Sequence, residues 1–447
     1  MWSFYNRSGT GGDSGMMLSL YRAAIHLGAP FIRIYLKHRI AEGKEDHLRF
    51  AERKGKSITP RPVGRLIWVH GASVGEALSV LPLIESLLQM DELLHVLLTT
   101  GTVSSAEFMA DRLPNRAFHQ YVPVDRINYV RRFLGHWKPD MALWVESEFW
   151  PNLILETQKR GTPMILVNGR ISPKSFAGWK RARTIISRLL QNFELCLGQT
   201  REDAERLRQL GAKSYKCVGN LKFSVPPLPA QTEELIRLQQ DINDRPRWLA
   251  ASTHDGEEEL AAYVHKELKK TYKSFLSILV PRHPTRGHEI AAMLKEEKGL
   301  KIALRSQGDP LTPETDIYLV DTMGELGLFF RLSDIVFMGK SLVPLGGQNP
   351  LEALRLECAV VHGPHMTNFQ SIVSEMSDFN CAISVPNGEA LAREINHLIS
   401  NEDIRTSMIA NGLAYLQSQS EVAENVKNEI MVILKNKVRK TKTDATT

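Results

Sequence analysis

Two glycine-bearing turns in the C-terminal half of the chain contain residue types that could bind a phosphate and a ribose. They are Asp321-Thr-Met-Gly-Glu-Leu-Gly327 and Gly339-Lys-Ser-Leu-Val-Pro-Leu-Gly-Gly-Gln-Asn-Pro-Leu-Glu352. Glycines let a backbone approach a phosphate closely, and a helix start offers free N–H donors. Each turn places a glutamate, Glu325 or Glu352, near an expected helix start, where a carboxylate can hold ribose hydroxyls. Either turn alone is typical of an ordinary helix start, but together they predict a nucleotide-sugar site.

The segment Ser73-Val-Gly-Glu76 follows an expected strand that ends at His70. Its spacing is that of a capping box, in which the Ser73 hydroxyl and the Glu76 carboxylate satisfy the first N–H groups of a helix. Glu76 would also stand at the carboxyl end of the first strand, where a carboxylate can act as a general base. Both interpretations remain open at the level of the sequence.

Other charged residues are expected at the ends of strands. Glu146 follows Trp144-Val145, Lys222 closes Gly219-Asn-Leu-Lys222, and Arg282 and His283 stand between two prolines. An arginine can hold a phosphate through two parallel hydrogen bonds. The segment Ser252-Thr-His-Asp-Gly-Glu257 is a secondary candidate for the phosphate side, because it would serve equally well as a simple helix cap.

No group of His, Cys, Asp or Glu has the spacing of a metal site, so we expect no metal and no cofactor. The four cysteines also lack redox spacing and are typical of buried thiols in a reducing compartment. A departing phosphate would therefore be neutralised by Arg, Lys and helix N-termini.

Short apolar runs that alternate with helical patterns must position these residues. Runs without polar alternation indicate parallel strands covered on both faces, and they predict an α/β fold. They occur at 66–70, 95–99, 141–145, 164–167 and 194–197, and again at 248–251, 275–280, 301–304, 317–320, 335–337 and 359–361. A proline-rich break at 225–229 separates the two sets, so we expect two doubly wound domains with a ligand cleft between them. The chain has no Walker A motif and no Gly-x-Gly-x-x-Gly after the first strand, which disfavours ATPases and dehydrogenases.

The length of 447 residues agrees with two domains. The expected boundaries are a disordered leader and interfacial helix at 1–45, an N-terminal domain at 46–228, a linker at 229–246, a C-terminal domain at 247–430 and a basic tail at 431–447.

The net charge of +6 is concentrated near the two ends of the chain. Lys and Arg outnumber Asp and Glu between Arg22 and Arg65, and the tail contains a second basic run. With no nucleic-acid motif present, this pattern favours an anionic membrane surface as the partner. Segment 16–40 has apolar patches interrupted by basic residues, and Gly28-Ala-Pro30 would bend it. It predicts an interfacial helix, although a helix packed on the first domain is the alternative.

These segments together resemble the 3-deoxy-D-manno-octulosonic acid (Kdo) transferases of lipid A assembly. The resemblance covers most of the chain, from about Lys44 to beyond Gly363-Pro-His-Met-Thr-Asn-Phe369. The motifs that carry it are SVGE, WVESEFWPN, NGRIS, GNLKF, AASTHDGEE, VPRHP, DTMGELG, SLVPLGGQNPLE and GPH.

This resemblance implies a GT-B arrangement of two facing Rossmann-like domains. It implies an inverting, metal-independent transfer of Kdo from CMP-Kdo to a lipid A precursor (lipid IVA) at the cytoplasmic face of the inner membrane. The protein would be peripheral or held by one N-terminal anchor. By matching motif, Glu76 would be the general base, and Glu146 and Lys222 would assist the transition state. The residues implied in CMP binding are Arg282, His283, Met323, Gly324, Glu325, Asn349, Pro350, Leu351 and Glu352.

Some positions depart from the family pattern. Gln348 stands in place of an expected histidine, Gly169 in place of an alanine and Ser224 in place of an acid. The N-terminal segment is also more charged than the anchors usual in the family. These differences bear on the acceptor and on the depth of membrane insertion rather than on the class of reaction.

Two other functions fit parts of the pattern. A UDP-sugar epimerase of GT-B form would share the two-domain architecture, but it would need neither a basic N-terminal segment nor a lipid acceptor. A non-catalytic, membrane-peripheral lipid-binding module would use that segment, but it would have no use for Glu76 and Arg282.

Overall fold

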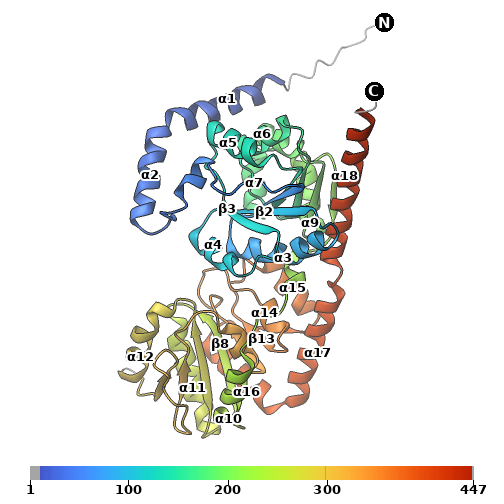
Figure 1. Ribbon diagram of the computed structural model, residues 1–447. Coiled ribbons are helices and arrows are strands. Elements are labelled where there is room, and N and C mark those ends of the chain that lie inside the picture. The colour runs from blue at the N-terminus through green and yellow to red at the C-terminus, as the bar shows by residue number, and fades with distance from the viewer. Residues whose placement is uncertain (1–10, 297, 445–447) are drawn as a thin grey trace. The chain divides into compact units, whose positions relative to one another are not determined.

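The computed structural model describes residues 11–296 and 298–444, and it divides into two compact α/β units. Within this range, the first unit ends at Val225 and resumes at Gln419, and the second unit is Pro226–Ser418. Each unit is built on one seven-stranded sheet (Figure 1).

The sheet of the first unit is parallel throughout, with strand order β3-β2-β1-β4-β5-β6-β7. Its strands are β1 (Arg65–His70), β2 (Leu94–Thr100), β3 (Ala117–Tyr121), β4 (Met141–Val145), β5 (Met164–Gly169), β6 (Leu195–Gly198) and β7 (Tyr215–Cys217). The central strands are apolar on both faces because helices cover both faces of the sheet.

Alternate residues of these strands enter two separate cores of the first unit. Leu66 and Trp68 of β1 pack with helices α1, α5, α6 and α8, whereas Ile67 and Val69 pack with α3 and α18. The helices are α1 (Gly11–Leu27), α2 (Ala29–Ala41), η1 (Phe50–Lys54), α3 (Val74–Gln89), α4 (Val103–Ala110), α5 (Ile127–Trp137), α6 (Pro151–Lys159), α7 (Pro173–Arg181), α8 (Arg183–Leu190), α9 (Arg201–Leu210), η2 (Leu221–Ser224) and α18 (Val422–Asp444).

The second unit repeats this plan, with strand order β10-β11-β9-β8-β12-β13-β14. Its strands, again all parallel, are β8 (Arg247–Thr253), β9 (Leu276–Pro281), β10 (Ile302–Leu304), β11 (Ile317–Leu319), β12 (Ile335–Met338), β13 (Ala359–His362) and β14 (Ala382–Ser384). Its helices are α10 (Thr232–Ile242), α11 (Glu257–Thr271), η3 (Pro284–Arg286), α12 (Gly287–Glu296), α13 (Leu326–Phe330), α14 (Leu351–Leu354), α15 (Gln370–Asp378), α16 (Gly388–Ser400) and α17 (Glu402–Ser418).

Two of the expected domain boundaries need correction. Residues 229–246, expected to be a linker, contain helix α10 and belong to the second unit because Leu238 and Ile242 are buried. Residues 419–430, expected in the C-terminal domain, belong to the first unit. Val422, Val426 and Ile430 form an apolar stripe on α18 that packs in the same core as Val69.

The expected basic tail is also the continuation of this helix. Helix α18 runs to Asp444, and Leu434 within the tail is buried in the core of the first unit. Residues 445–447 lie outside the described residues.

The N-terminal segment forms two helices that are separated at Gly28. A Cβ at Gly28 would stand 2.9 Å from the Ala24 carbonyl oxygen, which is too close for a larger residue without a shift. Residues 11–15, expected to be disordered, are the first turns of α1, and residues 1–10 lie outside the described residues. Among the residues with a described position, no helix is long and apolar enough to cross a bilayer.

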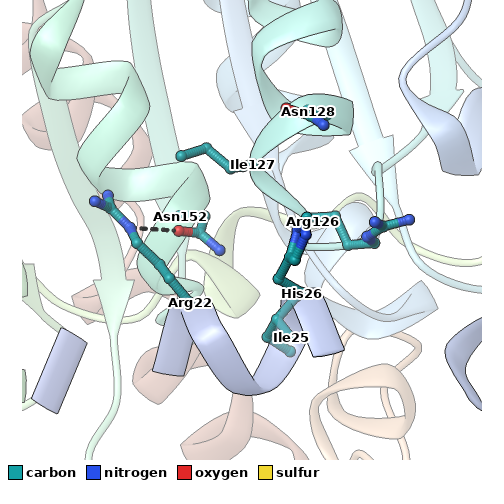
Figure 2. Close-up of a pocket in the computed structure, with 7 residues that line it drawn as sticks. All are labelled: Arg22, Ile25, His26, Arg126, Ile127, Asn128 and Asn152. Atoms are coloured by element: carbon teal, nitrogen blue, oxygen red, sulfur yellow. Dashed lines mark hydrogen bonds between the residues drawn. The ribbon is translucent and has the colours of Figure 1, made fainter. Parts of the chain in front are cut away.

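Helix α1 packs on the first unit. Leu18 is buried in its core, and the Tyr21 hydroxyl donates to Asp125 at 2.8 Å. Figure 2 shows Arg22 of α1 reaching Asn152 at the start of α6, with a distance of 3.1 Å between Nε and Oδ1. Arg22 also lies 3.6 Å from Glu156. The alternative expectation of a helix packed on the first domain therefore describes α1.

Candidate active site

Glu76 lies in the first turn of α3, directly after β1, and it forms the capping box that the sequence suggested. The Ser73 hydroxyl accepts from the Glu76 N–H at 3.3 Å and donates to Glu76 Oε1 at 2.9 Å. Glu76 Oε2 accepts from the Ala72 N–H at 2.7 Å. These bonds fix the orientation of the carboxylate at the carboxyl end of β1, so the structural role is compatible with a chemical one.

The surroundings of Glu76 favour its protonated form. Burial raises the pKa of Glu76 to about 7, and the negative charge of Glu146 acts in the same direction. The hydrogen bonds from Ala72 and Ser73 oppose this shift and are weaker than the burial effect. A carboxylate with a pKa near neutrality matches what general-base catalysis requires at physiological pH.

Glu146 and Lys222 form an ion pair at the same edge of the sheet. Glu146 directly follows β4, the strand next to β1, and it has a left-handed φ of 57°. Lys222 Nζ donates to Glu146 Oε1 at 2.9 Å, with both side chains mostly buried. The structure therefore brings the three predicted catalytic residues of the first unit to the ends of neighbouring elements.

The turn that carries Lys222 is held by buried amides. Asn168 Oδ1 accepts from the Leu221 N–H at 2.9 Å, and Asn220 Oδ1 accepts from the Lys222 N–H at 3.0 Å. Asn168 itself has a φ of 55°, a conformation that asparagine tolerates better than most residues. These two amides position Lys222. Asn168 belongs to the NGRIS motif, but the sequence analysis assigned it no role.

In the second unit, the predicted nucleotide residues follow three strands near one another in the sheet. Arg282 and His283 follow β9, Met323–Glu325 follow β11, and Asn349–Glu352 follow β12. The Arg282 side chain is exposed, and its positive charge lowers the pKa of Glu352, although burial of that carboxyl raises it more strongly. Asn349 Nδ2 donates to Glu352 Oε1 at 3.2 Å. Arg282 and Glu352 are thus electrostatically coupled at the carboxyl edge of this sheet.

Glu325 is already engaged by an arginine that sequence reasoning missed. Arg305 Nη2 donates to Glu325 Oε1 at 2.6 Å, and Arg305 also pairs with Glu234. Arg305 directly follows β10, so the signal that identified Arg282, an arginine at a strand end, could have found it. Next to Glu325, Met323 is exposed, and Gly324 has a φ of 84°.

The loop after β12 is held by a second glutamate. Glu257, at the start of α11, accepts hydrogen bonds from the backbone N–H groups of His254, Lys340, Ser341 and Leu342 at 2.6–3.0 Å. An internal carboxylate therefore occupies backbone donors that an anion could otherwise use. The segment that includes Glu257 was only a secondary phosphate candidate, and in the structure this residue is a scaffold of the loop.

The two helices expected to bind the phosphate at their N-termini are shorter than the sequence suggested. Helices α13 and α14 contain only 5 and 4 residues, so their dipoles are small. Positive charge for a phosphate must therefore come mainly from side chains such as Arg282. Within residues 11–296 and 298–444, no group of three or more His, Cys, Asp or Glu could hold a metal ion.

Comparison with known proteins adds independent information. The family model described as 3-deoxy-D-manno-octulosonic-acid transferase (kdotransferase) matches residues 46–225. A 3-deoxy-D-manno-octulosonic acid transferase of Rickettsia bellii is 33% identical over 412 residues, covering 91% of this chain and 97% of the relative. A probable mitochondrial 3-deoxy-D-manno-octulosonic acid transferase of Arabidopsis thaliana is 36% identical over 396 residues, covering 86% of this chain and 88% of the relative.

Among solved structures, a putative UDP-N-acetylglucosamine 2-epimerase from Listeria monocytogenes aligns with a TM-score of 0.60. The alignment covers 84% of this chain and 98% of that chain at 12% identity, which is a likeness of fold alone. Together with the two parallel sheets, it confirms the GT-B fold class predicted from the sequence.

Proposed function

Because the chain belongs to the 3-deoxy-D-manno-octulosonic acid (Kdo) transferase family, and is therefore a glycosyltransferase, we propose that it transfers Kdo from CMP-Kdo to a lipid A precursor, lipid IVA. The transfer inverts the anomeric configuration, and Glu76 is the general base. The observation that carries this proposal is the environment of Glu76, a carboxyl group with a pKa raised to about 7 beside the Glu146–Lys222 ion pair.

The proposed reaction exchanges one C–O bond for another at the anomeric carbon of Kdo. A sugar hydroxyl of the acceptor attacks that carbon, Glu76 takes the hydroxyl proton, and the bond to the CMP phosphate breaks, so CMP leaves with the electron pair. The transition state has oxocarbenium character. Glu146 and Lys222 would assist it by fixing the electrostatic field around Glu76. No metal ion takes part in this scheme.

The second unit would hold the nucleotide. Arg282 is the cation best placed to bind the leaving phosphate, since its side chain is exposed whereas Arg305 is already paired with two glutamates. Glu352 and Asn349 would contact the ribose, and His283, Met323, Gly324, Glu325, Pro350 and Leu351 would complete the CMP site.

The N-terminal helices would bring the protein to the lipid acceptor. Among the residues of α1 and α2 whose burial is described (18–41), large apolar side chains are exposed at Leu20, Leu27, Phe31, Ile34 and Tyr35. Arg33 and Lys37 of α2 are exposed beside them. Exposed apolar residues mixed with basic ones suit the interface of an anionic membrane. We therefore place the enzyme at the cytoplasmic face of the inner membrane, held peripherally by α1 and α2.

The direct test is a transfer assay with the full chain. The protein is incubated with lipid IVA and either CMP-Kdo or a UDP-sugar, with and without EDTA. The mass of the lipid product is then measured by mass spectrometry. We expect a mass increase of one or more Kdo units with CMP-Kdo only, whether or not EDTA is present. Epimerisation of the UDP-sugar, or no change in the lipid, would contradict the proposal.

A further inference from the structure

The first unit contains a long segment that has basic residues but no acidic residue. Between Glu156 and Glu194 the chain has three lysines and five arginines, and neither Asp nor Glu. Over the whole chain the two signs are nearly balanced, with 56 basic and 50 acidic residues, so this segment is a local excess of positive charge. It includes helices α7 and α8, and none of the proposed catalytic residues lies in it.

Five of these cations are exposed on the two helices. They are Lys174, Lys180 and Arg181 of α7 and Arg183 and Arg188 of α8. Within the described part of the chain, none of these five side chains is paired with a carboxylate, unlike Lys159 earlier in the segment, which pairs with Glu156. Their positive charge is therefore uncompensated and is available to an anionic partner.

Helix α7 lies on the surface of the unit rather than in its core. None of its residues is buried, and the half-buried Phe176 and Trp179 pack against the core. The Nζ of Lys180 lies 4.4 Å from the centroid of the Phe176 ring. Half-buried aromatic rings beside an exposed basic face are typical of an element that lies at a membrane interface.

Helix α8 joins this basic surface to the N-terminal helices. Ile186 of α8 and Leu18 of α1 are buried in the same core, and the two helices are in contact. Helices α1 and α2 carry the exposed apolar side chains that are proposed above to bind the membrane. The basic surface is therefore continuous with the proposed membrane contact.

Helix α7 also starts at the edge of the sheet where the proposed catalytic residues lie. It begins at Pro173, shortly after the end of β5, and β5 is the neighbour of β4, the strand that precedes Glu146. The ring of Trp179 meets Phe149 edge-on, with 6.1 Å between the centroids, and Phe149 belongs to the same loop as Glu146. A membrane in contact with α7 would therefore lie close to the proposed acceptor side.

We propose that α7 and α8 form a docking surface for the anionic lipid headgroups of the bilayer, adjoining the contact made by α1 and α2. This inference rests on the proposed function, because it names the partner of a surface beside the proposed acceptor side. The cations are spread over two helices, and exposed apolar side chains adjoin them on α1. This combination matches a plane of charged headgroups above apolar chains, whereas a nucleic acid would leave the apolar side chains without a partner.

The test measures binding of the full chain to vesicles in the absence of donor. The variant Lys174→Gln/Arg181→Gln/Arg188→Gln removes three exposed cations. Each basic residue close to an anionic membrane contributes about fivefold to binding, so the partition coefficient for vesicles of phosphatidylglycerol and phosphatidylcholine should fall by about a hundredfold. Binding to vesicles of phosphatidylcholine alone should not change. The charge-conserving variant Lys174→Arg/Arg181→Lys/Arg188→Lys should bind as the wild type does.

The matched control is Arg112→Gln/Lys138→Gln/Lys213→Gln. It removes the same charge from three exposed residues of the first unit. Each of them precedes a strand, so all three lie toward the amino edge of the parallel sheet, away from Glu76. At physiological ionic strength, charges more than about 8 Å from the membrane surface are largely screened. The control should therefore keep the wild-type partition coefficient to within about twofold.

Equal partition coefficients of the test variant and the control would overturn the assignment. A second measurement separates bilayer lipid from the acceptor. With lipid IVA dispersed in an uncharged detergent, the test variant should keep the wild-type KM for lipid IVA. A raised KM would overturn the assignment, because the surface would then bind the acceptor itself. Absence of transfer by the wild type would instead reject the proposed function, whereas the vesicle measurements would still decide whether α7 and α8 bind the bilayer.

Discussion

The Nζ of Lys222 lies 2.9 Å from Oε1 of Glu146, and this ion pair stands next to the general-base candidate Glu76. The charge of Glu146 helps to raise the pKa of Glu76, and Lys222 compensates part of that charge. The basicity of Glu76 therefore depends on a pair of residues that are distant in sequence.

Removal of this compensation should shift the pH dependence of transfer. Protonation of Glu76 should make the rate fall as the pH drops through about 7. In Lys222→Met, Glu146 is uncompensated, so the pKa of Glu76 should rise and the acidic limb of the kcat/KM profile should move to higher pH. Lys216→Met is the matched control, because Lys216 pairs with Glu429 at 2.7 Å elsewhere in the first unit. An acidic limb at the wild-type pH in Lys222→Met would show that the ion pair does not tune Glu76.

Glu76→Gln should lower kcat by roughly 10² to 10⁴, the usual contribution of a general base. The glutamine carbonyl oxygen can still accept from the Ala72 N–H, and its NH2 group can donate to the Ser73 hydroxyl, so we expect the helix cap and CMP binding to survive. The matched control is Glu85→Gln, because Glu85 is an exposed residue of the same helix, and this variant should keep wild-type turnover. Single-turnover transfer to lipid IVA measures the effect. Wild-type turnover in Glu76→Gln would remove this residue from the mechanism.

The same substitution should change stability in a pH-dependent way. Burial raises the pKa of Glu76 in the folded state to about 7, from the ordinary glutamate value of 4.5. Its contribution to folding is therefore fully present below pH 4.5 and is lost as the pH rises through about 7. Glu76→Gln, which cannot ionise, should have a higher Tm than the wild type at pH 8, and the difference should shrink toward pH 4.5. Calorimetric scans across this range are the check, and a constant difference in Tm would contradict the raised pKa.

The strands that the sequence predicted and those it missed differ in burial. The eleven apolar runs correspond to the strands β1, β2, β4, β5, β6 and β8–β13, but β3, β7 and β14 were not predicted. All three missed strands are at sheet edges, where one side has no neighbouring strand. Their sequences are accordingly polar or mixed, as in Tyr215–Cys217, whose three residues are all exposed. A pattern based on apolar runs detects only strands covered on both faces.

A candidate site residue could be named from the sequence where its own position carries the signal, whereas a contact that a partner defines could not. Glu76 and Arg282 were proposed because each follows a recognisable strand, and their roles stay predictions. Arg305 has the same signal, because it follows β10, but the sequence does not indicate that it pairs with Glu325. The role of Glu257 depends on the N–H groups of residues 340–342, which are far away in sequence. The extent of α18 was missed for the same reason, since its apolar stripe has meaning only against the first sheet.

Two arginines that are close in sequence should have opposite phenotypes. Arg282→Ala should raise KM for CMP-Kdo while leaving stability almost unchanged, because the side chain is exposed and is proposed to act on the phosphate. Arg286→Ala should instead destabilise the protein by about 1–3 kcal/mol, because it leaves the buried Glu258 carboxylate without its cation. Urea unfolding and donor saturation kinetics separate the two effects. Equal loss of stability in both variants would show that Arg282 is structural.

The exposed apolar residues of α2 should contribute to membrane binding. Phe31→Ser/Ile34→Ser removes two large side chains that are 76% and 64% exposed, so it should not disturb the core. Burial of such side chains is worth about 1.5–3 kcal/mol each, so loss of both should reduce the partition coefficient at least tenfold. Flotation with vesicles that contain anionic phospholipid measures this coefficient, and added salt should lower it further because Arg33 and Lys37 contribute through their charge. Ile58→Ser is the control, because Ile58 is 99% exposed in the first unit but lies outside α1 and α2. If Phe31→Ser/Ile34→Ser floats with the vesicles as well as Ile58→Ser does, helix α2 is not the membrane contact, and the acceptor must reach the enzyme by another surface.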